Sequence, residues 1–194
     1  YNPNTGSTSS SDCMVADAGS FVSTSGQSNQ TPCSAGTYNP NTGSTSFSDC
    51  MVADAGYYVD LSLGTGQASQ TPCPLGTYNP NNGSIYSSSC RTAFSGSYVV
   101  VSPGQSSSQK CAPGTYQPSS GQTKCELAEL GYYVPSEGRS AQTPCASGTF
   151  SDMVASITCT EAGAGYYVLN DDKAQRIQCP PFTNTYVGLM TSGN

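Results

Sequence analysis

The stretch TPCPLGTYNPNNGS, residues 71–84, places one cysteine before a Gly-Thr-Tyr step and a run of turn-forming residues. Close copies occur at TPCSAGTYNPNTGS (31–44) and KCAPGTYQPSSG (110–121), and a looser copy occurs at TPCASGTFSD (143–152). Glycine, asparagine and proline in this order are typical of a short β-strand followed by tight turns. The recurrence indicates a chain built from many small units.

The composition argues against an ordinary globular domain. Of the 194 residues, 32 are serine, 20 are threonine and only 18 are charged (6 Lys and Arg, 12 Asp and Glu), and tryptophan is absent. Such a chain buries too little apolar surface in one core to offset the entropy that it loses on folding. We therefore expect covalent cross-links, and the ten cysteines indicate a disulfide framework formed in an oxidising, extracellular compartment.

Several classes of partner are disfavoured. There is no histidine and no Cys-x-x-Cys pair, so we expect no zinc site. The net charge of −6 is spread over single acidic residues, which disfavours nucleic acid. No apolar run approaches the roughly 20 residues that span a bilayer, so we expect no membrane span. The adjacent Asp171 and Asp172 form either a solvated turn or a calcium ligand pair.

The cysteines divide the chain into two alternating kinds of segment. Segments of 14 or 17 residues begin Cys-x-x-Gly-Thr-aromatic, and longer segments carry Gly-x-aromatic-Val, as in CMVADAGYYV (50–59). We expect a small disulfide-rich, mainly β fold, an elongated tandem array of short β-hairpin half-units with no single central core. Only CELAEL (125–130) suggests a helical turn. The repeats run over 33–72, 73–110, 111–144 and 145–178, with partial repeats at 1–32 and 179–194.

One aromatic residue per half-unit lies at a fixed offset from the cysteine. We expect each ring to pack on a disulfide and on the next half-unit, and the alternative is a carbohydrate-binding platform. The motifs CPLGTYNP and C..A..GYYV resemble the ephrin-receptor-like cysteine-rich repeats of extracellular proteins, including long surface proteins of protists and algae. They are also similar to modules of the tumour-necrosis-factor-receptor type.

The resemblance implies a disulfide pairing. Where such repeats carry a second cysteine, this chain has alanine, as at Ala53, and three residues before the next cysteine it has Gln30, Gln70, Ser108, Gln142 or Arg176. Joint loss of both partners implies that the retained bonds are Cys33–Cys50, Cys73–Cys90, Cys111–Cys125 and Cys145–Cys159. A rival pairing uses all ten cysteines: 13–33, 50–73, 90–111, 125–145 and 159–179.

The implied pairing leaves Cys13 and Cys179 without partners. Residues 1–13 lack an opening Cys-x-x-Gly-Thr, and residues 179–194 open a half-unit without a closing cysteine. Either these residues are an excerpt of a longer array, or Cys13 and Cys179 bond neighbouring copies that meet head to tail.

The pattern favours a structural protein over an enzyme. Without histidine the chain lacks the usual general base, and its carboxylates are scattered. Asn29 and Asn82 lie in N-glycosylation sequons, and the Ser/Thr clusters either carry O-linked sugars or form a merely polar surface. We expect a secreted structural glycoprotein with covalent glycans and no cofactor, whose copies assemble into a surface filament, appendage or fibrous coat. The alternative is the stalk of a receptor or adhesin whose binding domain lies elsewhere.

Overall fold

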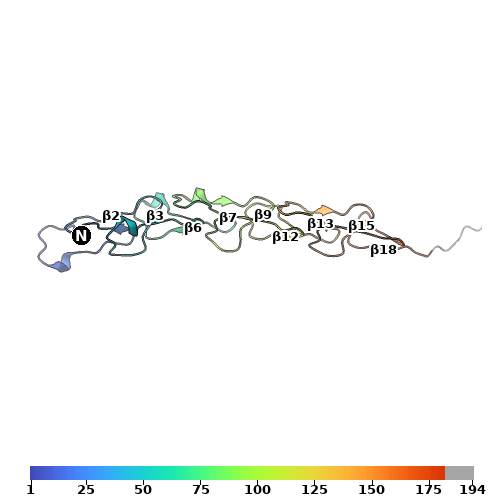
Figure 1. Cartoon of the computed structure of the whole chain (residues 1–194), viewed down its shortest axis with the longest axis horizontal. Helices are drawn as coiled ribbons and strands as arrows, with labels where there is room; N and C mark the ends of the chain where they lie inside the picture. The colour runs from blue at the N-terminus through green and yellow to red at the C-terminus, as the bar shows by residue number, and fades with distance from the viewer. Residues whose placement is uncertain (182–194) are drawn as a thin grey trace, which may run out of the picture.

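The computed structural model describes residues 1–181. These residues form a long, narrow rod in which small hairpins follow one another along a single axis (Figure 1). The expected tandem array of disulfide-linked hairpins is confirmed: the described residues contain nine two-stranded antiparallel sheets and four disulfides. The end of the partial repeat expected over 179–194 lies outside the described residues.

Each hairpin joins two strands of two residues. The pairs are, in chain order, β1 (Ser20–Phe21) with β2 (Thr31–Pro32), β3 (Thr37–Tyr38) with β4 (Met51–Val52), β5 (Tyr57–Tyr58) with β6 (Thr71–Pro72), β7 (Thr77–Tyr78) with β8 (Arg91–Thr92), β9 (Ser97–Tyr98) with β10 (Gln109–Lys110), β11 (Thr115–Tyr116) with β12 (Glu126–Leu127), β13 (Tyr132–Tyr133) with β14 (Thr143–Pro144), β15 (Thr149–Phe150) with β16 (Thr160–Glu161), and β17 (Tyr166–Tyr167) with β18 (Ile177–Gln178).

The hairpins belong to two alternating kinds of rung, which we name after their first residue. Cysteine rungs span 33–52, 73–92, 111–127 and 145–161, and alanine rungs span 16–32, 53–72, 93–110, 128–144 and 162–178. The two kinds share one plan: the first residue is buried, a glycine follows three residues later, and a two-residue strand comes next. Both half-units of the sequence repeat therefore adopt the same structure.

Main-chain hydrogen bonds join each rung to the next. Between the rungs 53–72 and 73–92, the Gly56 amide donates to the Asn79 carbonyl at 2.7 Å and the Val59 amide donates to the Ser84 carbonyl at 2.9 Å. In return the Gly83 amide donates to the Ala53 carbonyl at 2.8 Å. Because equivalent bonds recur at successive alanine-to-cysteine steps, the array grows by a repeated step, as in other solenoid proteins.

Rungs of the same kind lie directly against each other, two steps apart. A Cβ added at Gly36 would lie 2.5 Å from the carbonyl oxygen of Gly83, and one added at Gly76 would lie 2.0 Å from that of Gly121. Backbone therefore meets backbone at these turns, and both turn glycines also have positive φ. The cysteine rungs consequently form one column along the rod and the alanine rungs form a second.

The core is a narrow strip along the axis. It consists of the first residues of the rungs, such as Cys73 and Ala93, which are fully buried, and of alternating valine and amide side chains. Buried Asn79 satisfies its own polar groups: its Nδ2 donates to the Tyr57 carbonyl and to Ser84 Oγ, both at 2.9 Å. This strip takes the place of a central core. Every buried side-chain polar atom of the described residues has a hydrogen-bond partner.

One local expectation is wrong. Glu126–Leu127 of CELAEL form strand β12, because the register with Thr115 and Tyr116 fixes them in a hairpin. Helical turns occur elsewhere, as the 3-10 helices η1 (Ser10–Asp12), η2 (Phe47–Asp49), η3 (Leu61–Leu63) and η4 (Ser87–Ser89). Among the aromatic rings, Phe21 packs with Cys33 and Cys50 of the next rung, and most of the paired tyrosines are half-buried.

Candidate assembly interface

Disulfides close the cysteine rungs. The bonds are Cys33–Cys50, Cys73–Cys90, Cys111–Cys125 and Cys145–Cys159, with Cα–Cα distances of 5.6–5.7 Å. They coincide with the pairs that the family resemblance implies, and none of the rival pairs is present. Each bond closes the loop of its own rung, so no covalent link other than the main chain joins one described rung to another.

Hydrogen-bonded side chains close three of the alanine rungs at the corresponding place. Gln70 Nε2 donates to Asp54 Oδ2 at 2.7 Å, and the Asp54 amide donates to Gln70 Oε1 at 2.7 Å. We call this paired interaction the glutamine clamp. It recurs between Gln30 and Asp17 and between Gln142 and Glu129. The recurring glutamine was visible in the sequence, but its acidic partner was missed.

The two remaining alanine rungs differ. In the rung 162–178, Arg176 takes the glutamine position; its Nη1 donates to the Ala162 carbonyl at 3.1 Å and its guanidinium lies 4.3 Å from the ring centre of Tyr166. In the rung 93–110, Phe94 replaces the acidic residue and Ser108 replaces the glutamine. Phe94 is 75% exposed, and no disulfide or clamp closes this rung.

Residues 1–15 form half of a cysteine rung. The Tyr1 amino group donates to the Met14 carbonyl and the Met14 amide donates to the Tyr1 carbonyl, both at 2.8 Å. This is the pairing that Tyr38 and Met51 make in a whole rung. Asn2 and Ser7 also repeat a side-chain contact of whole rungs, with Asn2 Nδ2 donating to Ser7 Oγ at 2.8 Å. The closing half of the rung is thus folded.

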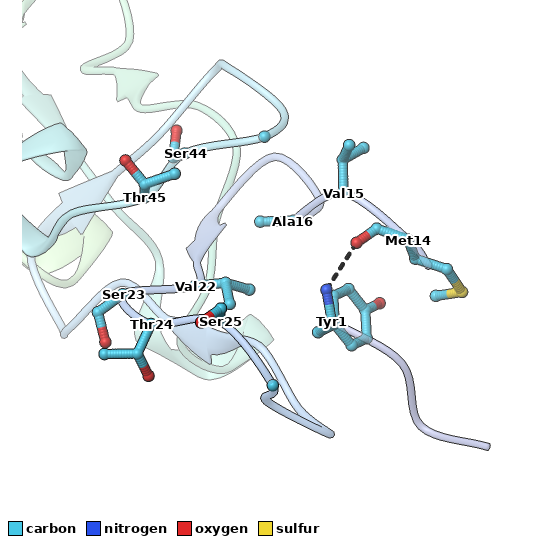
Figure 2. Close-up of a pocket in the computed structure, with 12 residues that line it drawn as sticks. Tyr1, Met14, Val15, Ala16, Val22, Ser23, Thr24, Ser25, Ser44 and Thr45 are labelled. Atoms are coloured by element: carbon cyan, nitrogen blue, oxygen red, sulfur yellow. Dashed lines mark hydrogen bonds between the residues drawn. The ribbon is translucent and has the colours of Figure 1, made fainter. Parts of the chain in front are cut away.

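A hollow of about 370 Å³ lies beside this half-rung. Figure 2 shows Tyr1, Met14 and Val15 on one side of it, with Ser23–Ser25 and Ser44–Thr45 from the next two rungs on the other. In whole cysteine rungs the Cys-x-x-Gly turn lies against the loop glycine two rungs ahead, as Gly36 does against Gly83. For the half-rung that loop glycine is Gly43, which lines the hollow. The hollow therefore lies where whole cysteine rungs have their Cys-x-x-Gly turn.

Cys13 and Cys179 are exposed and form no disulfide. Cys13 follows a capped 3-10 turn, and its amide donates to the Ser10 carbonyl, as the amide of the closing Cys50 does to Phe47. The Cys179 amide donates to the Gly165 carbonyl at 2.8 Å, as the amide of the opening Cys73 does to Gly56. Cys13 thus has the position of a closing cysteine and Cys179 that of an opening one.

The two sequon asparagines are exposed, whereas Asn39 and Asn79 are fully buried. Asn29 precedes strand β2, and Asn82 lies in the loop of the rung 73–92. They lie in different columns, because Asn29 belongs to an alanine rung and Asn82 to a cysteine rung.

Electrostatic effects on titrating groups are local. Burial raises the pKa of Tyr116, and the carboxylates of Glu126 and Glu129 raise it further. Burial likewise raises the pKa of Tyr38, together with Asp54 and Tyr57. The one ion pair of the described residues joins Lys110 to Glu137 at 2.8 Å and raises the pKa of Lys110. These pKa shifts arise from residues of the same or a nearby rung, and the shifted groups do not cluster at one site.

Within residues 1–181, no three His, Cys, Asp or Glu side chains are grouped so as to hold a metal ion. The Asp172 carboxylate accepts hydrogen bonds from the Ala174 amide at 3.0 Å and from Gln175 at 3.4 Å. The same part of the chain contains no helix with the length and apolar character needed to cross a membrane.

No protein-family model and no curated protein matches the chain.

Proposed function

We propose that the chain is an extracellular structural glycoprotein, a subunit that self-assembles into a surface filament, appendage or fibrous coat. The observation that carries the proposal is the repetition of one stacking step along the rod, with backbone groups as its main contacts. A step that depends on backbone more than on particular side chains can also form between chains, at the cost of the translational and rotational freedom lost on association. The four disulfides and the resemblance to extracellular cysteine-rich repeats support the extracellular setting.

The half-rung at residues 1–15 supports a head-to-tail contact. The hollow beside it is lined by the loop glycine Gly43, which in whole rungs contacts a Cys-x-x-Gly turn, and Cys13 directly precedes the lining residue Met14. At the other end of the described array, Cys179 has the position of an opening cysteine, although the sequence continues as Pro-Pro-Phe without the glycine of the other opening turns. In the proposed contact, Cys179 of one copy lies next to Cys13 at the hollow of the next copy. A contact between two different surfaces does not close on itself and propagates as a fibre.

A disulfide between Cys179 and Cys13 of the neighbouring copy would lock this contact. The two thiols lose two protons and two electrons to a disulfide oxidant of the secretory compartment, which is reduced to a dithiol. The bond requires the two Cα atoms to approach within about 7 Å. The four disulfides within the chain meet the same requirement in equivalent rung positions.

Peptide mapping without reduction, combined with sedimentation, tests the contact. The oxidised 194-residue chain is expected to form oligomers that contain a Cys13–Cys179 peptide, and Cys13→Ser is expected to abolish this peptide. Ser11→Ala, an exposed change in the same turn, is the control. Monomeric chains with both thiols free would contradict the proposal and favour the stalk alternative. Native material in which Cys13 bonds a cysteine of preceding sequence would show one continuous array instead.

A further inference from the structure

We propose that Asn29 and Asn82 carry N-linked oligosaccharides and that the two sites differ in when they accept them: Asn82 only before its rung closes, Asn29 also afterwards. This inference depends on one part of the proposed function, the export of the chain through the secretory pathway. It does not require filament formation, so the two can fail separately.

In the sequon Asn29-Gln30-Thr31, the side chains of Asn29 and Thr31 remain accessible in the folded chain, while Gln30 between them is held by its clamp. Asn29 and Thr31 are both exposed, and the hydroxyl of Thr31 has no hydrogen-bond partner among residues 1–181. The Asn29 amide makes only a 3.5 Å contact with Ser28 Oγ, which is at the weak limit of hydrogen-bond length. Its rung is closed by the Gln30 clamp and not by a disulfide. Thr31 begins β2, an edge strand that has one partner.

The sequon Asn82-Gly83-Ser84 is open only in part. The Asn82 side chain is exposed, but the hydroxyl of Ser84 accepts a hydrogen bond from Nδ2 of buried Asn79 at 2.9 Å. Its oxygen also lies 3.4 Å from the Asn81 carbonyl, to which it donates. The Ser84 carbonyl accepts the Val59 amide of the preceding rung. Freeing Ser84 would leave the Asn79 amide short of a partner in the core, which is costly.

Glycan transfer needs both residues of the sequon at once. The amide nitrogen of asparagine attacks the anomeric carbon of an oligosaccharide carried on a lipid pyrophosphate. The new C–N bond forms as the C–O bond to the pyrophosphate breaks, the nitrogen loses one proton, and the lipid pyrophosphate leaves. The sequon hydroxyl is part of what the transferase recognises, so a hydroxyl held in the fold prevents the reaction.

The state of one disulfide therefore controls the Asn82 site. Cys73–Cys90 closes the rung that holds Asn82 and Ser84 in place. Before this bond forms, the segment is an unfolded loop and its sequon is free. After it forms, Ser84 is fixed to Asn79. No disulfide closes the rung of Asn29, so oxidation does not change that site in the same way.

Translation of the chain into microsomes, with and without a reductant, tests the proposal. Under reducing conditions we expect two glycans per chain, each seen as a mobility shift that an endoglycosidase removes. When the chain is first oxidised and folded and then given the transferase with its lipid-linked donor, we expect one glycan, at Asn29. Asn29→Gln should then remove all modification, and Asn82→Gln should remove none.

A further variant separates closure of the rung from the sequence of the sequon. Cys73→Ser with Cys90→Ser should restore modification of Asn82 in the non-reduced chain. The matched control, Cys145→Ser with Cys159→Ser, opens a different rung and should leave Asn82 unmodified after folding. Two glycans on the folded, oxidised wild-type chain would overturn the difference between the sites. Bare asparagines under reducing conditions would overturn the sites themselves.

Discussion

The side chain of Gln70 makes two hydrogen bonds with Asp54, one to its carboxylate and one from its main-chain amide, both 2.7 Å long. In the neighbouring cysteine rung, the residues that correspond to Ala53 and Gln70 are Cys33 and Cys50, which are bonded. The glutamine clamp thus closes its rung where a disulfide closes the other kind. Covalent and polar closure alternate over the four rungs from 16 to 92 and again over the three rungs from 111 to 161.

Gln70→Ala should loosen one rung without unfolding the others. Loss of the exposed clamp is expected to cost about 1 kcal/mol, the usual net contribution of such hydrogen bonds. Amide hydrogen exchange in the segment 54–70 should then speed up by about fivefold, while exchange in the disulfide-closed rung 73–92 stays unchanged. Ser69→Ala, an exposed neighbour outside the clamp, is the control. Unchanged exchange in both variants would show that the clamp does not stabilise the rung.

The rung 93–110 should be the first described rung that a broad-specificity protease cuts, between residues 99 and 108. It has neither a disulfide nor a clamp, and it also lacks the arginine that bonds the first residue of the rung 162–178. Local opening is governed by such contacts. Phe94→Glu with Ser108→Gln copies the Glu129–Gln142 pair and should slow cleavage there several-fold, whereas Phe94→Glu alone should not. Equal cleavage of the double variant and the wild type would contradict this assignment.

Ala155→Gly should stabilise the protein. Ala155 has a φ of 58° and is the one non-glycine residue with positive φ in the described chain. It has the position of Gly43, Gly83 and Gly121 in the other rungs, where its amide donates to the Ala128 carbonyl. Relief of this left-handed conformation is expected to add about 1 kcal/mol to the free energy of unfolding.

Denaturant titration measures the effect of Ala155→Gly. Ala112→Gly, at an exposed turn position outside the left-handed region, should lower the free energy of unfolding by about 0.5–1 kcal/mol. Opposite signs for the two substitutions support the assignment, and equal signs would refute it.

Alkaline pH should weaken the rung of Tyr116. Burial and the carboxylates of Glu126 and Glu129 raise its pKa above the ordinary 10.0, so ionisation is harder in the folded chain than in the unfolded chain. Its contribution to stability is present in full below pH 10.0 and is lost as the pH rises through the folded pKa. Glu126→Gln should lower the pKa of Tyr116, followed by NMR of labelled tyrosine rings. Glu161→Gln, in the next cysteine rung, should leave it unchanged.

The repeated sequence predicted much of this fold. Cys-x-x-Gly-Thr-Tyr with its turn residues located the hairpins at β3, β7, β11 and β15, because glycine and proline restrict the local backbone strongly. The pairing of Cys73 with Cys90 came from the resemblance to other repeats, since spacing alone allowed the rival bond to Cys50. Local sequence patterns thus define the hairpin units but do not determine which cysteine each cysteine bonds.

Features that depend on three-dimensional neighbours were not predicted. The contact between Gly36 and Gly83 joins rungs two steps apart, and no local pattern specifies which rungs will meet. Gln70 was recognised as a substituted cysteine, but its clamp requires Asp54 to lie opposite it, which only the closed loop brings about. CELAEL was assigned to a helical turn by local propensity, and pairing with Tyr116 placed it in a strand.

Electron microscopy of the oxidised chain over a range of concentrations tests the central claim most directly. Self-assembly through the array's own stacking step predicts unbranched fibres as thin as one rod, many times longer than a single chain, whose number falls when Cys13 is replaced by serine. Separate rods of one chain length at every concentration, in the wild type and the variant alike, would contradict it.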